Sequence, residues 1–133
     1  MSKHYYKRFS RVKTDVMAEA LDDVIGMQPD HLILCIHVKS QLTQGAGVID
    51  VLPDDLVRDL KKQNRGTYKG RPVYLLTDKI KPTCGPGGVA LAPFIDLKLL
   101  PQIEACFPKA IIYMPWMENE LPAYAALPDA EEI

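Results

Sequence analysis

The fold is decided by the stretch His31-Leu32-Ile33-Leu34-Cys35-Ile36-His37-Val38. Between its two histidines every residue is apolar, so the run does not alternate between a buried and a solvated face. Strands of this kind are covered on both faces, as in parallel sheets flanked by helices. The stretch therefore predicts the central strand of a parallel sheet.

Helical and strand patterns alternate along the rest of the chain. Apolar residues recur at three- and four-residue spacing from Ser10 to Gly26, which is typical of an amphipathic helix. Two shorter helices are indicated at residues 53–65 and 96–107, and two further strands at residues 73–77 and 110–114. This α-β-α-β-α-β order predicts an α/β fold, a small three-layer sandwich with a mostly parallel sheet of three or more strands.

Strand order and strand number depend on two less clear segments. The most apolar run belongs at the centre, which gives the order 2-1-3 for the three clear strands. Residues 47–51 and 89–92 also resemble short strands, so an added hairpin or edge strand is compatible with the pattern.

Length and composition indicate one soluble domain. The chain has 133 residues, of which 47% are hydrophobic and 25% charged, as in ordinary globular proteins. No apolar run is long enough to span a bilayer, and the polar start does not resemble a secretory signal. Its three cysteines are too scattered for a disulfide framework. We expect a cytoplasmic protein with reduced thiols, no membrane association and no cofactor.

The two ends of the chain differ in charge. Residues 1–121 form the predicted domain, which begins with a basic arm at residues 1–9, and residues 122–133 are expected to form a weakly ordered acidic tail. Five bases and no acid occur in the first 13 residues, interleaved with aromatic residues: Lys3, Lys7, Arg8, Arg11 and Lys13, with Tyr5, Tyr6 and Phe9. Such an arm could bind nucleic acid. The alternative, which we prefer, is pairing of these bases with acids within the fold or between protomers.

Three loops are predicted to meet at one edge of the sheet, because parallel strands end on the same side. The loops follow Val38, Thr77 and Met114. Glycine amides and lysines in them favour a small anionic ligand, with a protein partner as the alternative. The predicted binding residues are Ser40, Gln44, Lys79, Lys81, Thr83, Gly85, Gly87, Gly88 and Trp116. No phosphate-loop or dinucleotide-binding motif accompanies them.

Catalytic and metal-binding candidates are few. Cys84-Gly85-Pro86 resembles the start of the Cys-Gly-Pro-Cys turn of thioredoxin-like oxidoreductases, but Gly87 stands in place of the second cysteine, so a dithiol cycle cannot run within the loop. Cys84 or Asp78 remains as a candidate catalytic residue. Cys35 and His37 share a strand face without a second ligand pair, so no metal site is expected.

Three function classes follow from these features. The preferred one is a ligand- or partner-binding module that uses the loops at the edge of the sheet. The second is an enzyme acting on a phosphate-bearing or nucleotide-like substrate, and the third is a homo-oligomeric interaction protein.

Overall fold

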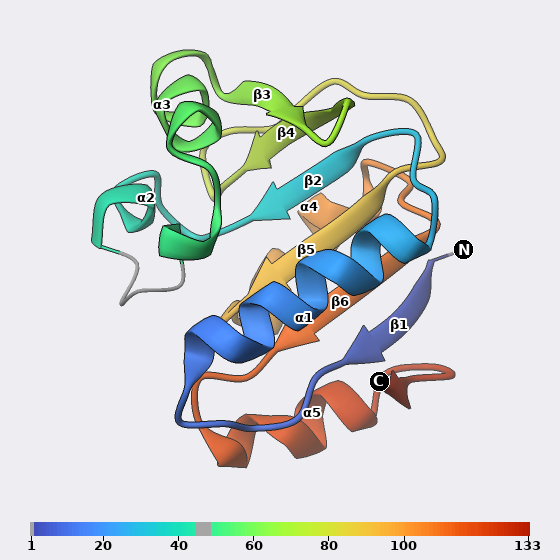
Figure 1. Cartoon of the computed structure of the whole chain (residues 1–133). Coiled ribbons are helices and arrows are strands. Elements are labelled where there is room, and N and C mark those ends of the chain that lie inside the picture. Colours follow the sequence, from blue (N-terminus) through green and yellow to red (C-terminus); the bar gives the residue numbers. More distant parts are fainter. Residues whose placement is uncertain (1, 45–48) are drawn as a thin grey trace.

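A computed structural model describes residues 2–44 and 49–133 of the chain. Within these residues the fold is mixed α/β, with a seven-stranded, mostly parallel sheet in the order β3-β4-β2-β5-β6-β1-β7 (Figure 1). The strands are β1 (Lys3–Tyr6), β2 (Leu32–Cys35), β3 (Arg65–Tyr68), β4 (Arg71–Leu76), β5 (Val89–Pro93), β6 (Ala110–Met114) and β7 (Glu131–Glu132). Only β3 runs antiparallel to its neighbour, β4. The predicted α/β class and mostly parallel sheet are confirmed.

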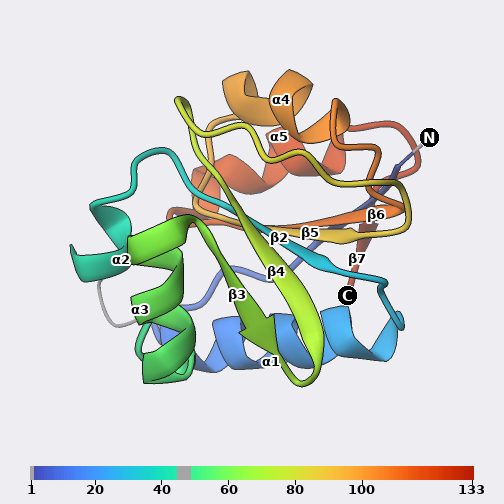
Figure 2. The ribbon, with the colours of Figure 1, turned by 90° about the horizontal axis from the view of Figure 1, so that it is seen from above.

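Helices lie on both faces of the sheet. One face carries α1 (Lys13–Gly26) and α3 (Asp54–Gln63), and the other carries α4 (Leu100–Glu104) and α5 (Leu121–Ala125), as Figure 2 shows. A short α2 (Gln41–Gln44) and the 3-10 turns η1 (Ile49–Val51), η2 (Leu97–Leu99) and η3 (Glu118–Glu120) complete the elements. No helix among the described residues is long and apolar enough to cross a membrane.

Strand β2 separates two hydrophobic clusters, as its sequence predicts. Leu32 and Leu34 pack with the buried face of α1, whereas Ile33 and Cys35 pack with residues of α4 and α5. All four residues of β2 are buried. Because side chains alternate along a strand, a run without polar positions is what burial on both faces requires.

The strict α-β-α-β-α-β order is not confirmed. Strand β1 precedes the first helix, and no α-helix separates β3, β4 and β5. The three clear strands keep their predicted relative order, but β5 lies between β2 and β6 and is parallel to both. Residues 89–92 are therefore central rather than an edge strand or hairpin. Of residues 47–51, two lie outside the described residues and the others form η1.

The basic arm lies inside the sheet. Strand β1 pairs with β6 in parallel, and the next residue, Lys7, is buried with its Nζ 2.8 Å from Asp23 Oδ2. Arg8 donates two hydrogen bonds to the carboxylate of Glu19, at 2.7 and 2.8 Å. At the other end of the chain, residues 122–133 contribute to α5 and supply β7, which pairs with β1. Bases of the arm thus pair with acids of the same chain.

Candidate functional site

The parallel strands end together on one side of the sheet, which we call the carboxyl edge. It consists of the residues that directly follow β1, β2, β4, β5 and β6. Backbone hydrogen bonds join these ends: Asp78 N donates to His37 O at 3.1 Å, and Phe94 N donates to Met114 O at 2.9 Å. Open α/β sheets place their binding sites at this edge.

His37 is held at the carboxyl edge by both of its ring nitrogens. Nε2 lies 2.7 Å from the backbone nitrogen of Asp96, and Nδ1 lies 3.3 Å from Asp78 Oδ1. A backbone N–H can only donate, so Nε2 accepts and Nδ1 carries the proton that it donates to Asp78. These two contacts fix the orientation of the imidazole and the hydrogen-bond role of each ring nitrogen. Neither ring nitrogen is left to take a proton from a substrate.

An open pocket of about 480 Å³, which we call the acceptor-lined pocket, lies beside His37. This volume falls within the roughly 300–1,000 Å³ of small-molecule sites. The lining residues follow β2 and β5 or belong to η2, η3 and α5, and they are His37, Phe94, Ile95, Asp96, Leu97, Asn119, Glu120, Ala123 and Tyr124. Polar groups in this lining are mainly acceptors, and the lining residues described include no lysine or arginine.

Two carboxylates of this pocket are positioned by backbone donors. Glu120 Oε1 accepts from the backbone N–H groups of Trp116 and Met117, both at 2.7 Å, which folds the loop after β6 back onto η3. Asp96 Oδ1 accepts from Lys98 N at 2.9 Å. Each bond uses one carboxylate oxygen, and a carboxylate offers about four lone-pair sites. Both groups thus keep acceptor capacity for a ligand.

Next to the pocket lies a group of cationic and aromatic side chains, which we call the shelf: Phe9, Arg11, Lys13 and Trp116. The Lys13 ammonium lies 4.2 Å from the Phe9 ring centroid and 5.4 Å from that of Trp116, both cation–π contacts. An open pocket of about 510 Å³ lies over these residues. Burial lowers the pKa of Lys13, and the Glu120 carboxylate opposes that shift. Trp116 of the shelf packs edge-to-face on Phe94 of the acceptor-lined pocket, so the shelf and this pocket are neighbours.

The predicted binding residues do not all meet. Lys79, in the turn after β4, and Trp116, after β6, lie at the carboxyl edge, and Ser40 is exposed just before α2. Gln44 ends α2, but its side chain lies outside what the structure describes. Lys81, Thr83 and Gly85 are exposed in the connection that runs from the end of β4 back to the start of β5 (Figure 1).

Gly87 and Gly88 lie at the opposite edge of the sheet. Gly87 O accepts from Asp30 N at 3.1 Å, and Gly88 O accepts from Lys109 N at 2.8 Å. A Cβ on Gly88 would stand 2.6 Å from Cδ2 of the His31 ring. Gly87 has φ +96, and a Cβ there would clash with the Asp30 carboxylate. The close contacts at both positions, and the positive φ of Gly87, therefore explain why glycine occupies them without invoking a ligand.

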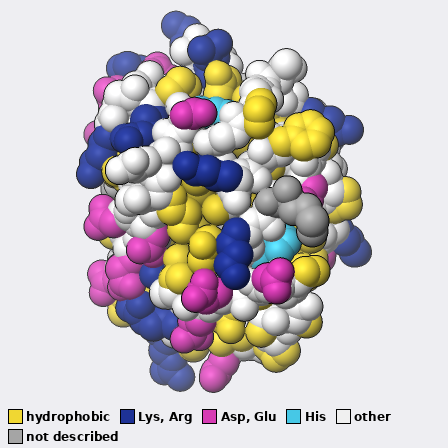
Figure 3. All heavy atoms as spheres, turned by 90° about the vertical axis from the view of Figure 1, so that its right-hand side faces the viewer, with side chains coloured by type: hydrophobic (Ala, Val, Ile, Leu, Met, Phe, Trp, Pro, Cys, Tyr) yellow, Lys and Arg dark blue, Asp and Glu magenta, His cyan; other side chains and the backbone are white. Residues whose placement is uncertain are grey.

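The surface at this opposite edge has mixed chemistry. Figure 3 shows the face at the amino ends of the parallel strands. On this face hydrophobic side chains are exposed among basic and acidic ones.

The three cysteines approach one another on the α4 side of the sheet. Cys84 packs against the cluster that contains Cys35 and Cys106, and all three are free thiols. Burial raises the pKa of Cys84, and it raises that of Cys106 to about 11. Raised pKa values keep these thiols protonated at neutral pH, which makes them poor nucleophiles. Within residues 2–44 and 49–133 no group of three His, Cys, Asp or Glu residues could hold a metal ion.

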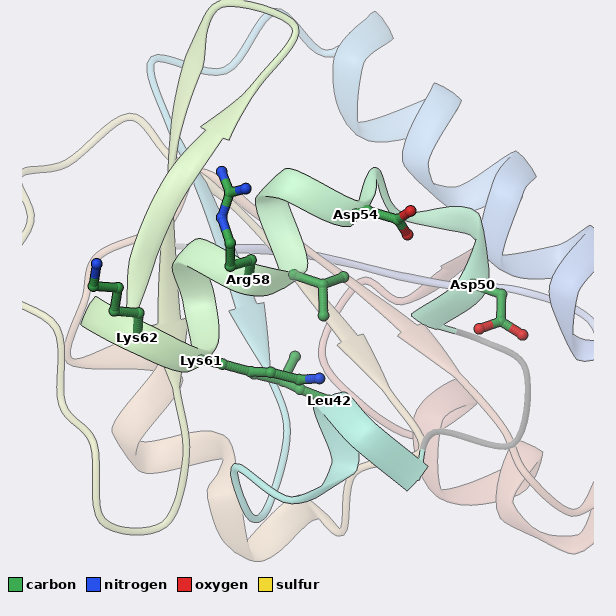
Figure 4. Close-up of a pocket in the computed structure, with 7 residues that line it drawn as sticks. Leu42, Asp50, Asp54, Arg58, Lys61 and Lys62 are labelled. Carbon is green, nitrogen blue, oxygen red and sulfur yellow. The ribbon is translucent and has the colours of Figure 1, made fainter.

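A further pocket, which the sequence did not indicate, lies between α2 and α3 (Figure 4). Its volume is about 600 Å³, and its charged lining residues are Asp50, Asp54, Arg58, Lys61 and Lys62. In Figure 4 Asp50 and Asp54 lie on one side, Arg58 and Lys62 lie on the other, and the Lys61 side chain extends between them. Mixed charge of this kind selects no single class of ligand.

The comparisons with known proteins found no match: no family model matches the chain, and neither the search of curated proteins nor that of solved structures found a similar chain. The functional interpretation rests on the residues of the carboxyl edge.

Sequence reasoning missed the role of Asp96 at this edge. Asp96 follows β5 and donates its backbone N–H to His37. Recognition of residues 89–92 as a parallel inner strand would have placed Asp96 beside His37 in advance, because that assignment makes the residues after β5 part of the same edge.

Proposed function

We propose that the protein is a ligand-binding module whose ligand occupies the acceptor-lined pocket at the carboxyl edge. The observation that carries this proposal is the fixed arrangement of His37, Asp96 and Glu120 around an open pocket of about 480 Å³. Each of these side chains is held by at least one backbone donor, so the site exists before a ligand arrives. Pre-organised polar groups reduce the entropy lost on binding.

The lining favours a ligand that presents hydrogen-bond donors. Asp96 and Glu120 supply carboxylate oxygens, and Asn119 supplies an amide that can both accept and donate. Phe94 and Tyr124 line the same pocket with aromatic surface. An amine, an amino group on a ring or a ring N–H meets these requirements. Any anionic group on the ligand requires cations from outside the pocket.

Binding is favoured over catalysis by the state of the candidate catalytic residues. His37 has no free ring nitrogen, because Nδ1–H donates to Asp78 Oδ1 and Nε2 accepts from the backbone N–H of Asp96, so this imidazole cannot act as the base that would activate a nucleophile. Cys84 is half-buried with a raised pKa. A general base or nucleophile requires a free lone pair at the reacting atom.

The wider proposal is a three-layer sandwich in the cytoplasm. Helices on both faces of the sheet favour the layered description, and free thiols are typical of a reducing compartment. The opposite charges at the chain ends, which suggested a homo-oligomer, are accounted for in part within one chain, since Lys3 Nζ lies 3.9 Å from Glu131 Oε2.

Asn119→Ala tests the proposal. Asn119 is exposed in η3, and its truncation removes a polar group of the pocket without opening the core. We expect a panel of amine-bearing metabolites and nucleosides to contain a compound whose binding, measured by isothermal titration calorimetry, weakens roughly tenfold or more in this variant, which is about 1.4 kcal/mol.

Gln63→Ala is the matched control, because Gln63 is exposed at the end of α3 and lines none of the pockets described. Equal affinity of Asn119→Ala and the parent protein for every binding compound would contradict the proposed site, as would a panel without any binder.

A further inference from the structure

We infer that the ligand is a nucleoside monophosphate, with the phosphate on the shelf, the base against Trp116 and the donor edge of the base in the acceptor-lined pocket. This inference rests on the proposed function and names the ligand class of the same site.

The shelf has cations available for an anion. Of the five bases near the start of the chain, Lys3, Lys7 and Arg8 pair with acids, namely Glu131, Asp23 and Glu19. No such ion pair involves Arg11 or Lys13 within residues 2–44 and 49–133, and Arg11 is exposed. Arginine offers five N–H donors in a planar fork that matches phosphate geometry, and a lysine ammonium adds a compact charge.

The shelf also has an aromatic surface on which a ring can stack. Trp116 is 42% exposed, and its indole packs edge-to-face on Phe94, with ring centroids 4.9 Å apart and an interplanar angle of 82°. That contact holds the orientation of the indole through Phe94, a residue of the acceptor-lined pocket. Nucleobases stack on exposed aromatic side chains of this type.

Trp116 and Glu120 join the two parts of the site. Trp116 belongs to the shelf, and its backbone N–H donates to Glu120 Oε1 at 2.7 Å, while Glu120 lines the acceptor-lined pocket. A ring stacked on Trp116 therefore adjoins both the cations of the shelf and the pocket that Glu120 and Asp96 line. Amino and ring N–H groups of a purine are donors that carboxylates accept, and its phosphate requires cations.

The test is calorimetric titration of the full chain with guanosine monophosphate, guanosine, ribose 5-phosphate and inorganic phosphate, repeated with the adenine series. We expect one monophosphate to bind at least roughly tenfold more tightly than its nucleoside and than ribose 5-phosphate, about 1.4 kcal/mol in each comparison. Arg11→Ala should lower the affinity for the monophosphate to that for the nucleoside and leave nucleoside binding unchanged. Arg58→Ala, an exposed arginine on α3, is the matched control.

Several results would overturn the inference. Equal binding of nucleoside and monophosphate, with loss of both in Asn119→Ala, would remove the phosphate from the shelf but keep the proposed pocket. Binding of ribose 5-phosphate as tight as that of the nucleotide would remove the base. Absence of binding by every compound in the nucleotide series would exclude this ligand class, and amine binders sensitive to Asn119→Ala would then still support the pocket. Tighter binding of a single-stranded oligonucleotide, with steep salt dependence, would assign the edge to nucleic acid instead.

Discussion

Gly88→Ala is expected to destabilise the fold by about 1–3 kcal/mol, the usual cost of overpacking a core. A Cβ at this position would stand 2.6 Å from His31 Cδ2, well inside the 3.4–4 Å of ordinary van der Waals contact. The ring has little room to move, because His31 is 7% exposed and packs edge-to-face against Tyr74, with centroids 5.4 Å apart. At roughly 4 °C per kcal/mol, the melting temperature should fall by about 4–12 °C.

Urea unfolding of a double-mutant cycle tests this explanation directly. In the His31→Ala background the ring is gone, so Gly88→Ala should cost less than about 0.5 kcal/mol there. Gly85→Ala is the control, since a Cβ on Gly85 would meet nothing within 4 Å, and its effect should stay within about 0.5 kcal/mol. The same cost for Gly88→Ala in both backgrounds would refute the packing role and restore a ligand-binding role for this glycine.

Other predictions concern charge and thiol chemistry. Burial lowers the pKa of His31 below its usual 6.5, so just below pH 6.5 the unfolded chain binds a proton that the folded chain does not. The free energy of unfolding should therefore fall as the pH drops below about 6.5. His31→Gln should flatten that part of a plot of unfolding free energy against pH. A hydrogen bond from Arg8 lowers the pKa of Glu19 from 4.5 to about 2. The contribution of Glu19 to the stability of the fold is therefore present above pH 4.5 and lost as the pH falls toward 2. Glu19→Gln should remove this acid-dependent loss of stability. Lys7→Met leaves Asp23 without its 2.8 Å partner and should cost about 1–3 kcal/mol in urea unfolding, against less than about 1 kcal/mol for Lys3→Met at an exposed pair. Mass spectrometry should show Cys84 reacting with iodoacetamide at pH 7.5 more slowly than glutathione does, because burial raises its pKa, and faster reaction would contradict that environment.

The class of the fold was predictable because β2 carries an unambiguous pattern. Only burial on both faces explains an apolar residue at every position of Leu32–Cys35, and the amphipathic spacing of Val16, Met17 and Ala20 in α1 is equally direct. Strand β1 was not predicted, because Lys3 and Lys7 resemble a solvated arm. Lys7 is buried only because Asp23 and Glu19 of α1 neutralise it, a long-range contact that local pattern does not report.

The positions of the predicted binding residues in the fold agree with expectation in part, and the differences have one cause. The lysines and glycines of residues 79–88 were expected at one edge of the sheet. However, β5 is parallel to β4, so the segment between them must cross from one edge to the other. Lys79 therefore stays at the carboxyl edge, and Gly87 and Gly88 lie beside Asp30 and His31. The assignment of β5 as an inner strand decides the position of the whole loop.

The central claim is that ligand binds at the carboxyl edge, and amide chemical shifts test it most directly. A ¹H–¹⁵N titration of the full chain with guanosine monophosphate should shift the backbone signals of Asp96 and Asn119 and the indole signal of Trp116, and leave Gly85, Gly87 and Gly88 unchanged. The first three signals belong to the carboxyl edge, whereas the glycines lie at the opposite edge or in the connection that leads to it. One titration therefore distinguishes the two candidate binding sites. Shifts confined to the glycine amides would contradict the account and assign the ligand to the other edge of the sheet.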